Sequence, residues 1–157
     1  MGDKQDTATR LLERIETAWA AFNASYAGLA AAELAEPGVA GEWSVKDILA
    51  HITTWEGEAL KYLPVIIAGG TPPRYATEGG LDAFNARMAQ QKRGLALAEV
   101  RRQLRDTHQR LIAYIEAAPP EQFAHESRAR RRLRLDTYGH YPEHSRMIQE
   151  WRVRRKG

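Results

Sequence analysis

The chain has 157 residues, of which 43% are hydrophobic, 23 are Lys or Arg, 20 are Asp or Glu, and none is Cys. This length suits one domain with a sizeable core, and we expect a single domain over residues 1–157. Without cysteine there is no disulfide, thiolate metal site or cysteine nucleophile, so a metal ion must be held by His, Asp or Glu. The composition excludes a disordered chain, and no apolar stretch approaches the roughly 20 residues of a membrane span.

The two ends of the chain differ in character. Residues 1–6 contain no apolar signal region, so we expect a cytoplasmic protein that does not bind membranes. Residues 1–120 contain 13 basic and 15 acidic side chains, whereas residues 121–157 contain 10 and 5. Such a basic surplus attracts polyanions, but it is also typical of a solvated loop and a helix C-terminus. Nucleic-acid binding is not favoured, because no aromatic residues alternate with the arginines. The surplus comes from Arg128, Arg130, Arg131, Arg132 and Arg134 and from Arg152, Arg154, Arg155 and Lys156.

The first two helices are predicted from apolar spacing and from a capping signal. Between residues 7 and 29, the side chains of Leu11, Ile15 and Phe22 fall on one side of a helical wheel, which indicates an amphipathic helix. Residues 30–41 lose this pattern and are expected to form a loop. Ser44 and Asp47 form a capping box, which predicts a second helix from there toward residue 69. Pro64 is able to kink this helix or to end it early.

The second half of the chain continues the helical pattern. A third helical region covers residues 81–118, with a break or bend at Gly94. In the arginine-rich stretch that follows, Leu133 and Leu135 alternate with charged residues, so a short extended piece is expected there. The last helix is predicted to start at Asp136 or Thr137 and to end near residue 153. Amphipathic helices must bury their apolar faces against one another, so the sequence predicts an all-α bundle.

The five histidines differ in their placement. His140 and His144 are four residues apart, which puts both imidazoles on the same side of a helix. His51 lies at the edge of the apolar face of the second helix. Three neutral imidazoles from these positions can bind a divalent cation and leave coordination sites open, but such a pair also occurs without a metal, satisfied by local hydrogen bonds. His108 is expected to be a core histidine with a hydrogen-bond partner, and His125 a solvated loop residue.

Pro142 lies between the paired histidines and has no N–H, so it is tolerated only in the first turn of a helix. If the helix begins near Gly139, the pair converges. If the proline displaces Tyr141 from helical geometry, His140 and His144 need not meet.

Two sequence blocks carry a resemblance to a known family. They are GVAGEWSVKDILAH at residues 38–51, followed by Trp55 and Glu56, and TYGHYPEH at residues 137–144, followed by Ile148 and Trp151. Together with residues 81–85, they resemble the DinB-like superfamily and, within it, the ClbS/DfsB group. The resemblance covers most of the chain. It implies a DinB-like four-helix bundle, up-and-down with a long left-handed crossover, which is often dimeric.

The resemblance also implies a metal site and an activity. In metal-binding members, one His on the second helix and a His-x-x-x-His pair on the last helix bind a divalent ion. These positions match His51, His140 and His144, so the expected cofactor is zinc, nickel or iron. The superfamily includes thiol-dependent transferases and isomerases, and the ClbS/DfsB group includes a self-resistance hydrolase for which metal dependence is not implied. The predicted function is a detoxification or self-resistance hydrolase or transferase that acts on a reactive small molecule.

Other residues near the three histidines are candidates for catalysis. Glu58, about two turns beyond His51, can act as a base or orient a ligand, although such a glutamate is more often an exposed helix residue. Tyr62, Tyr138 and Tyr141 can donate to a substrate oxygen, although tyrosines at bundle edges more commonly anchor packing. The alternatives to an enzyme are a metal-free protein that sequesters a small molecule and a nucleic-acid-associated protein that uses the arginine-rich segment. A homodimer fits each of these. The tryptophans are core residues or walls of a pocket for an apolar or electrophilic molecule: Trp43, Trp55 and Trp151.

Overall fold

The computed structural model describes the backbone of residues 2–157 and the side chains of residues 7–157. The expectation drawn from the side chains of residues 1–6 therefore lies outside the described residues. No strand occurs in the part of the chain that is described, and the predicted all-α class is confirmed. The helices are α1 (Gly2–Ser25), α2 (Ala31–Leu34), α3 (Val45–Ile67), α4 (Leu81–Lys92), α5 (Leu97–Ala117), α6 (Arg128–Asp136) and α7 (Tyr141–Lys156), with 3₁₀ turns η1 (Tyr75–Glu78) and η2 (Pro120–Phe123).

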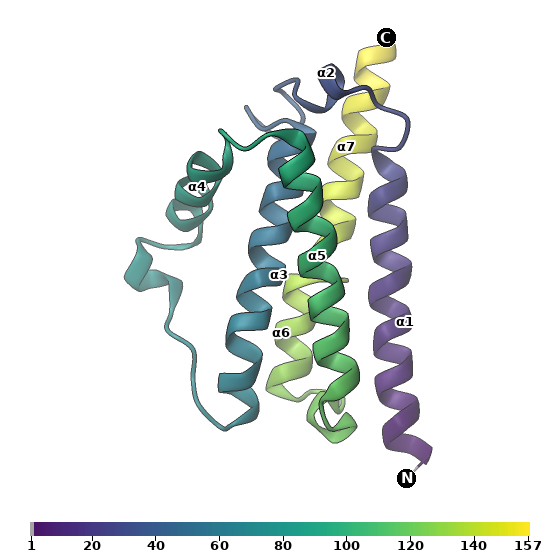
Figure 1. Ribbon diagram of the computed structural model, residues 1–157, viewed down its shortest axis with the longest axis vertical. Helices are drawn as coiled ribbons and strands as arrows, with labels where there is room; N and C mark the ends of the chain where they lie inside the picture. Colours follow the sequence, from purple (N-terminus) through teal and green to yellow (C-terminus); the bar gives the residue numbers. More distant parts are fainter. Residues whose placement is uncertain (1) are drawn as a thin grey trace.

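A bundle is formed by α1, α3, α5 and the column of α6 followed by α7 (Figure 1). The connection between α3 and α5 returns along the outside of the bundle and contains η1 and α4, so α3 and α5 run parallel. This connection is the predicted long crossover. Helix α3 packs on α5, α6 packs on α3, and α7 packs on α1. The C-terminal column therefore contacts two different neighbours along its length.

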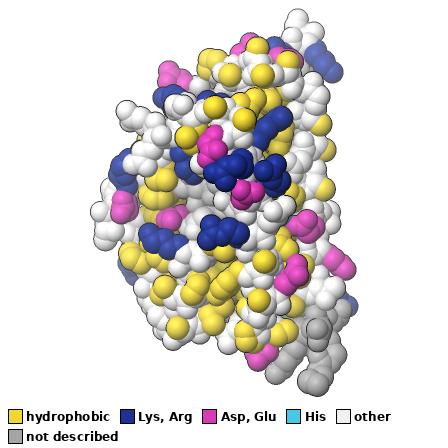
Figure 2. Space-filling model, in the orientation of Figure 1, with side chains coloured by type: hydrophobic (Ala, Val, Ile, Leu, Met, Phe, Trp, Pro, Cys, Tyr) yellow, Lys and Arg dark blue, Asp and Glu magenta, His cyan; other side chains and the backbone are white. Residues whose placement is uncertain are grey.

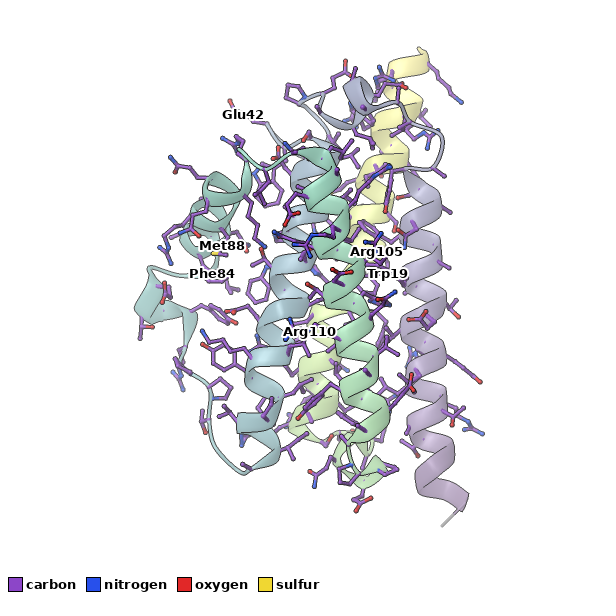
Figure 3. The ribbon with its side chains drawn as sticks, in the orientation of Figure 1. Trp19, Glu42, Phe84, Met88, Arg105 and Arg110 are labelled. Atoms are coloured by element: carbon purple, nitrogen blue, oxygen red, sulfur yellow. The ribbon has the colours of Figure 1, made fainter. Side chains whose placement is uncertain are left out.

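The predicted start of α3 is confirmed by its hydrogen bonds. The Asp47 backbone N–H donates to Ser44 Oγ at 3.1 Å, and the Ser44 N–H donates to the Asp47 carboxylate at 2.9 Å. Pro64 does not end the helix early, because α3 continues to Ile67. The break predicted at Gly94 is also confirmed, since it lies between α4 and α5. Phe84 points from α4 toward α3 (Figure 3), and its ring lies 5.5 Å from that of Trp55.

Several boundaries differ from the sequence-based expectations. Helix α1 ends at Ser25 and not near residue 29, and the short α2 occupies part of the expected loop. The extended piece predicted at residues 132–136 is wrong, because this segment is the helix α6. Leu133 is fully buried while Leu135 is 66% exposed, so the two leucines do not share a face as they would in a strand. The Ser127 hydroxyl caps α6 by accepting from the Arg130 N–H.

The last helix begins at Tyr141, later than predicted. The backbone leaves helical geometry at Thr137, which has φ −130° and ψ −105°. A Cβ atom on Gly139 would lie 2.6 Å from the Arg134 carbonyl oxygen, so this tight connection requires glycine. The connection lets α7 change direction relative to α6.

The core lies between the bundle helices. The apolar face predicted for the first helix is confirmed, since Leu11, Ile15 and Phe22 are fully buried. They meet fully buried side chains of the other helices: Ile48, Leu49, Ile52 and Leu63 of α3, Leu111 of α5, Leu133 of α6 and Ile148 of α7. Within the described residues, no helix combines the length and apolar character needed to cross a membrane.

Candidate metal centre

Three histidines that lie far apart in sequence meet in the structure. His51 comes from the first half of α3, His140 directly precedes α7, and His144 lies in its first turn. The His51 and His140 Nε2 atoms are 3.0 Å apart, and so are the His140 and His144 Nε2 atoms. Pro142 occupies the first turn of α7, where the missing N–H is not needed. The predicted pair therefore converges, and it does so together with His51.

The surroundings of these rings keep them neutral. Burial, reinforced by His140, His144 and Lys92 nearby, lowers the pKa of His51 to about 2. Burial, reinforced by His144, lowers the pKa of His140 to about 3. The pKa of His144 is also lowered by burial. A neutral imidazole offers a lone pair, which is the form that a metal ion binds.

The contacts of the three rings match the requirements of one cation. Two nitrogens that bind the same ion at about 2.0–2.1 Å lie roughly 3.0–3.4 Å apart. One nitrogen of each ring lies within 4.8 Å of the others, and the two shorter separations are 3.0 Å. The Nδ1 atoms of His140 and His144 are buried and have no hydrogen-bond partner among the described residues, so the polar contacts of these two rings are made through Nε2. Three neutral nitrogens that face one another fit a divalent ion.

The three histidines line a cavity of about 650 Å³ whose walls are mainly aromatic and aliphatic. This volume is typical of a small-molecule site. The Trp55 indole is held in place by donating from Nε1 to Asn85 Oδ1 at 2.9 Å, and the Trp43 ring lies 5.0 Å from that of His51. The cavity is lined by Ala40, Trp43, His51, Trp55, Tyr75, Leu81, Asn85, Arg132, Leu135, Asp136, His140, Glu143, His144 and Met147.

A buried ion pair lies in the wall of the same cavity. Arg132 Nε donates to Asp136 Oδ2 at 2.7 Å, and Asp136 is only 3% exposed. Burial raises the pKa of Asp136 to about 7, although Arg132 opposes this shift. Arg132 also donates to the Tyr75 hydroxyl at 2.7 Å. The sequence does not single out these three residues as part of a site, because the arginine-rich stretch also fits a solvated loop. The spacing of Arg132 and Asp136, four residues apart, could have indicated the pair.

The residues predicted to act in catalysis lie outside the cavity wall. Glu58 reaches the cavity indirectly, because it accepts a hydrogen bond from the Tyr75 hydroxyl at 3.1 Å. Tyr62 lies in a neighbouring pocket with Glu58, where its ring centroid is 5.4 Å from the Arg132 guanidinium. The Tyr138 hydroxyl accepts from Arg130 Nε at 3.2 Å. A role in catalysis for Glu58, Tyr62 and Tyr138 stays a prediction.

Two further histidines and one tyrosine have clear surroundings. His108 is buried and hydrogen-bonded to Glu56 and Glu16, as predicted for a core histidine. His125 is exposed, as expected. Of the two alternatives for Tyr141, the structure supports packing, because its side chain is fully buried and its hydroxyl donates to Glu56.

Much of the C-terminal basic surplus serves contacts within the fold. Arg130 is buried and donates to the carbonyl of Phe123, and Arg128 donates to the carbonyl of Gly70. Figure 2 shows the face over α4 and α5, where basic side chains lie among acidic ones. These contacts give little support to nucleic-acid binding through this segment. Other arginines with internal partners are Arg132, Arg152 and Arg155.

The sequence matches the model of the DinB superfamily over residues 14–147, and the chain belongs to this superfamily. Among solved structures, the fold is similar to that of a protein described as a sibling lethal factor precursor, DfsB, with a TM-score of 0.77. The two are 14% identical, and the similarity covers 94% of this chain and 96% of that one. At this identity, the likeness concerns the fold. Comparison with curated protein sequences gives no significant match.

Proposed function

We propose that this DinB-superfamily protein is a metal-dependent hydrolase or thiol transferase that detoxifies a reactive, largely apolar small molecule. One observation carries the proposal: three neutral imidazole nitrogens converge in the wall of an apolar cavity. His51, His140 and His144 would hold the ion. A divalent ion bound by three protein ligands lowers the pKa of coordinated water and polarises a substrate oxygen.

The chain's own residues supply the rest of the reaction site. Trp43 and Trp55 exclude water and receive an apolar substrate body. Asp136 lies in the cavity wall with a pKa of about 7, so it can hold or release a proton near neutral pH. Arg132 keeps the Asp136 carboxyl in place through its hydrogen bond.

Metal content is the direct test. We would measure it by mass spectrometry on untagged protein purified without added metal, beside the variant His140→Ala/His144→Ala. His125→Ala is a matched control, since this exposed histidine lies outside the cavity. The wild type and the control are expected to carry near-stoichiometric metal, and the double variant none. A wild type that binds no zinc, nickel or iron after reconstitution would contradict the proposal.

A second candidate function is sequestration of a small molecule without turnover. The apolar walls of the 650 Å³ cavity support it, because they can bind a ligand without any metal. The two functions differ in stoichiometry. One equivalent of protein exhausts a binder, whereas an enzyme converts many equivalents of the reactive molecule.

A further inference from the structure

A second polar cluster lies inside the bundle, away from the cavity. Glu56 of α3 is fully buried and accepts from the Tyr141 hydroxyl at 2.8 Å. The Nδ1 atom of His108, on α5, lies 3.0 and 3.1 Å from the two Glu56 carboxylate oxygens. Its Nε2 atom lies 2.7 Å from Oε1 of Glu16, on α1. Helices α1, α3, α5 and α7 thus each contribute one member of this network.

The hydrogen bonds of His108 define its charge. An ionised carboxylate only accepts hydrogen bonds, so a ring with a carboxylate on each nitrogen must donate from both. With both carboxylates ionised, His108 is an imidazolium between Glu16 and Glu56; burial opposes this arrangement by raising the pKa of Glu56. Burial lowers the pKa of His108, but the hydrogen bonds and charges of Glu56 and Glu16 outweigh burial and raise it above its usual value.

The surroundings of His108 hold the ring in one orientation. The Trp19 indole stacks on it with a centroid distance of 3.7 Å and an interplanar angle of 3°. Figure 3 shows Trp19 between α1 and α5, near Arg105. Figure 2 shows no histidine on this face of the molecule, although His108 lies on α5. Trp19 covers one face of the ring, and both ring nitrogens have a hydrogen-bond partner.

The network is attached to the segment that brings the three histidines together. Tyr141 directly follows His140 and begins α7, just after the backbone turns away from α6. Glu56 lies five residues beyond His51 on α3. Helices α3 and α7 pack mainly against other helices and share few contacts with each other. The hydrogen bond between Tyr141 and Glu56 therefore ties the first turn of α7 to the helix that carries His51.

We propose that Glu56 and His108 are positioning residues for the three-histidine site. They hold the Tyr141 hydroxyl, and through it they set the distance between His51 and the pair formed by His140 and His144. Neither lines the cavity, so neither contacts the substrate. This positioning role rests on the proposed function only as far as the site binds a metal ion and acts on a substrate. The positions of the three rings are set in the metal-free protein as well.

The first experiment measures the geometry without metal. Tyr141→Phe removes one hydroxyl and leaves the packed ring. Tyr26→Phe is the matched control, because Tyr26 is also buried and its hydroxyl binds Asn23 on α1. In NMR spectra of the metal-free protein, we expect the nuclear Overhauser effects between the rings of His51 and His140 to weaken several-fold in Tyr141→Phe and to persist in Tyr26→Phe. Unchanged effects in a folded Tyr141→Phe would overturn the proposal.

The network partners give a second comparison. Glu56→Gln retains an oxygen that accepts from Tyr141, whereas Glu56→Leu does not. The ring contacts are expected to survive in Glu56→Gln and to be lost in Glu56→Leu. If the substitutions acted only by lowering stability, the ring contacts would not distinguish Glu56→Gln from Glu56→Leu. If Glu56→Leu fails to fold, Tyr141→Phe still decides the question. Nitrogen chemical shifts should also show His108 protonated on both nitrogens at pH 7, and a neutral ring would contradict the network described above.

Cobalt binding connects the geometry to the site. Second-layer partners of metal ligands typically contribute about 10–100-fold in affinity, so we expect Tyr141→Phe to bind Co²⁺ roughly tenfold more weakly than wild type. Tyr26→Phe should match wild type. If Tyr141→Phe binds Co²⁺ as tightly as wild type, the positioning role is refuted. A wild type that binds no Co²⁺ would contradict the proposed function, while the ring contacts in the metal-free protein would still test the positioning.

Discussion

The buried carboxyl of Asp136 should make the stability of this protein depend on pH in a recognisable way. The folded protein holds the pKa of Asp136 at about 7, above its ordinary value of 3.8, chiefly because burial disfavours the charged form. A raised carboxyl pKa stabilises the folded state fully below pH 3.8, and this contribution is lost as the pH rises through about 7. Asp136→Asn removes the titration and keeps an oxygen that accepts from Arg132.

The magnitude follows from the two pKa values. Between them, the folded state holds one proton more than the unfolded state, so the free energy of unfolding falls by about 1.4 kcal/mol per pH unit. From pH 5 to pH 7, the wild type should lose about 2 kcal/mol relative to Asp136→Asn, because the slope flattens near the folded pKa. Asp136 is almost fully buried, so solvent screening does not reduce this value greatly.

The assay is urea unfolding at pH 5, 6 and 7 on protein dialysed against a chelator, since a bound cation would lower the pKa of a nearby carboxyl. Asp106→Asn provides a control, because Asp106 is a half-buried residue of α5 that lies outside the cavity and pairs with Arg102. The control is expected to follow wild type across this range. If the profiles of wild type and Asp136→Asn run parallel, Asp136 does not titrate near neutrality, and its assignment as the proton-carrying group of the cavity is wrong.

Three other substitutions test separate features. Gly139→Ala should lower the free energy of unfolding by about 1–3 kcal/mol in the same urea assay, because the new Cβ would meet a carbonyl oxygen. Gly57→Ala is the control: a Cβ there meets open space, so the variant should be neutral or stabilising. Ser44→Ala should cost about 1 kcal/mol by removing the helix cap, as thermal unfolding would reveal. Arg131→Gln/Arg134→Gln removes two exposed arginines of α6 and should leave RNA binding at low salt unchanged; a steep loss would instead favour a nucleic-acid partner.

The fold and the three histidines were predictable because the signals are local. Helical spacing placed Leu11, Ile15 and Phe22 on one buried face, and the capping box placed the start of α3. The four-residue spacing of His140 and His144 put both on one side of a helix, and the two family-like blocks added His51. Each of these signals depends on neighbours within about one or two helical turns.

Other features depended on contacts between distant segments. The stretch with Leu133 and Leu135 has a pattern compatible with a strand, and only packing against α3 decides that the first leucine is buried and the second exposed. Asp136 acquires its raised pKa from burial within the fold, and no residue next to it in sequence indicates that burial.

The buried network shows the same division. The sequence predicted that His108 lies in the core with a partner, but the partners Glu16 and Glu56 lie 92 and 52 residues away along the chain. Tyr141 lies between the candidate ligands His140 and His144 in the sequence, yet its hydroxyl donates to Glu56 inside the bundle. The sequence by itself thus determined the helices and the histidines available for a metal. The tertiary structure decided which polar groups meet, because burial and long-range hydrogen bonds arise only when the helices pack.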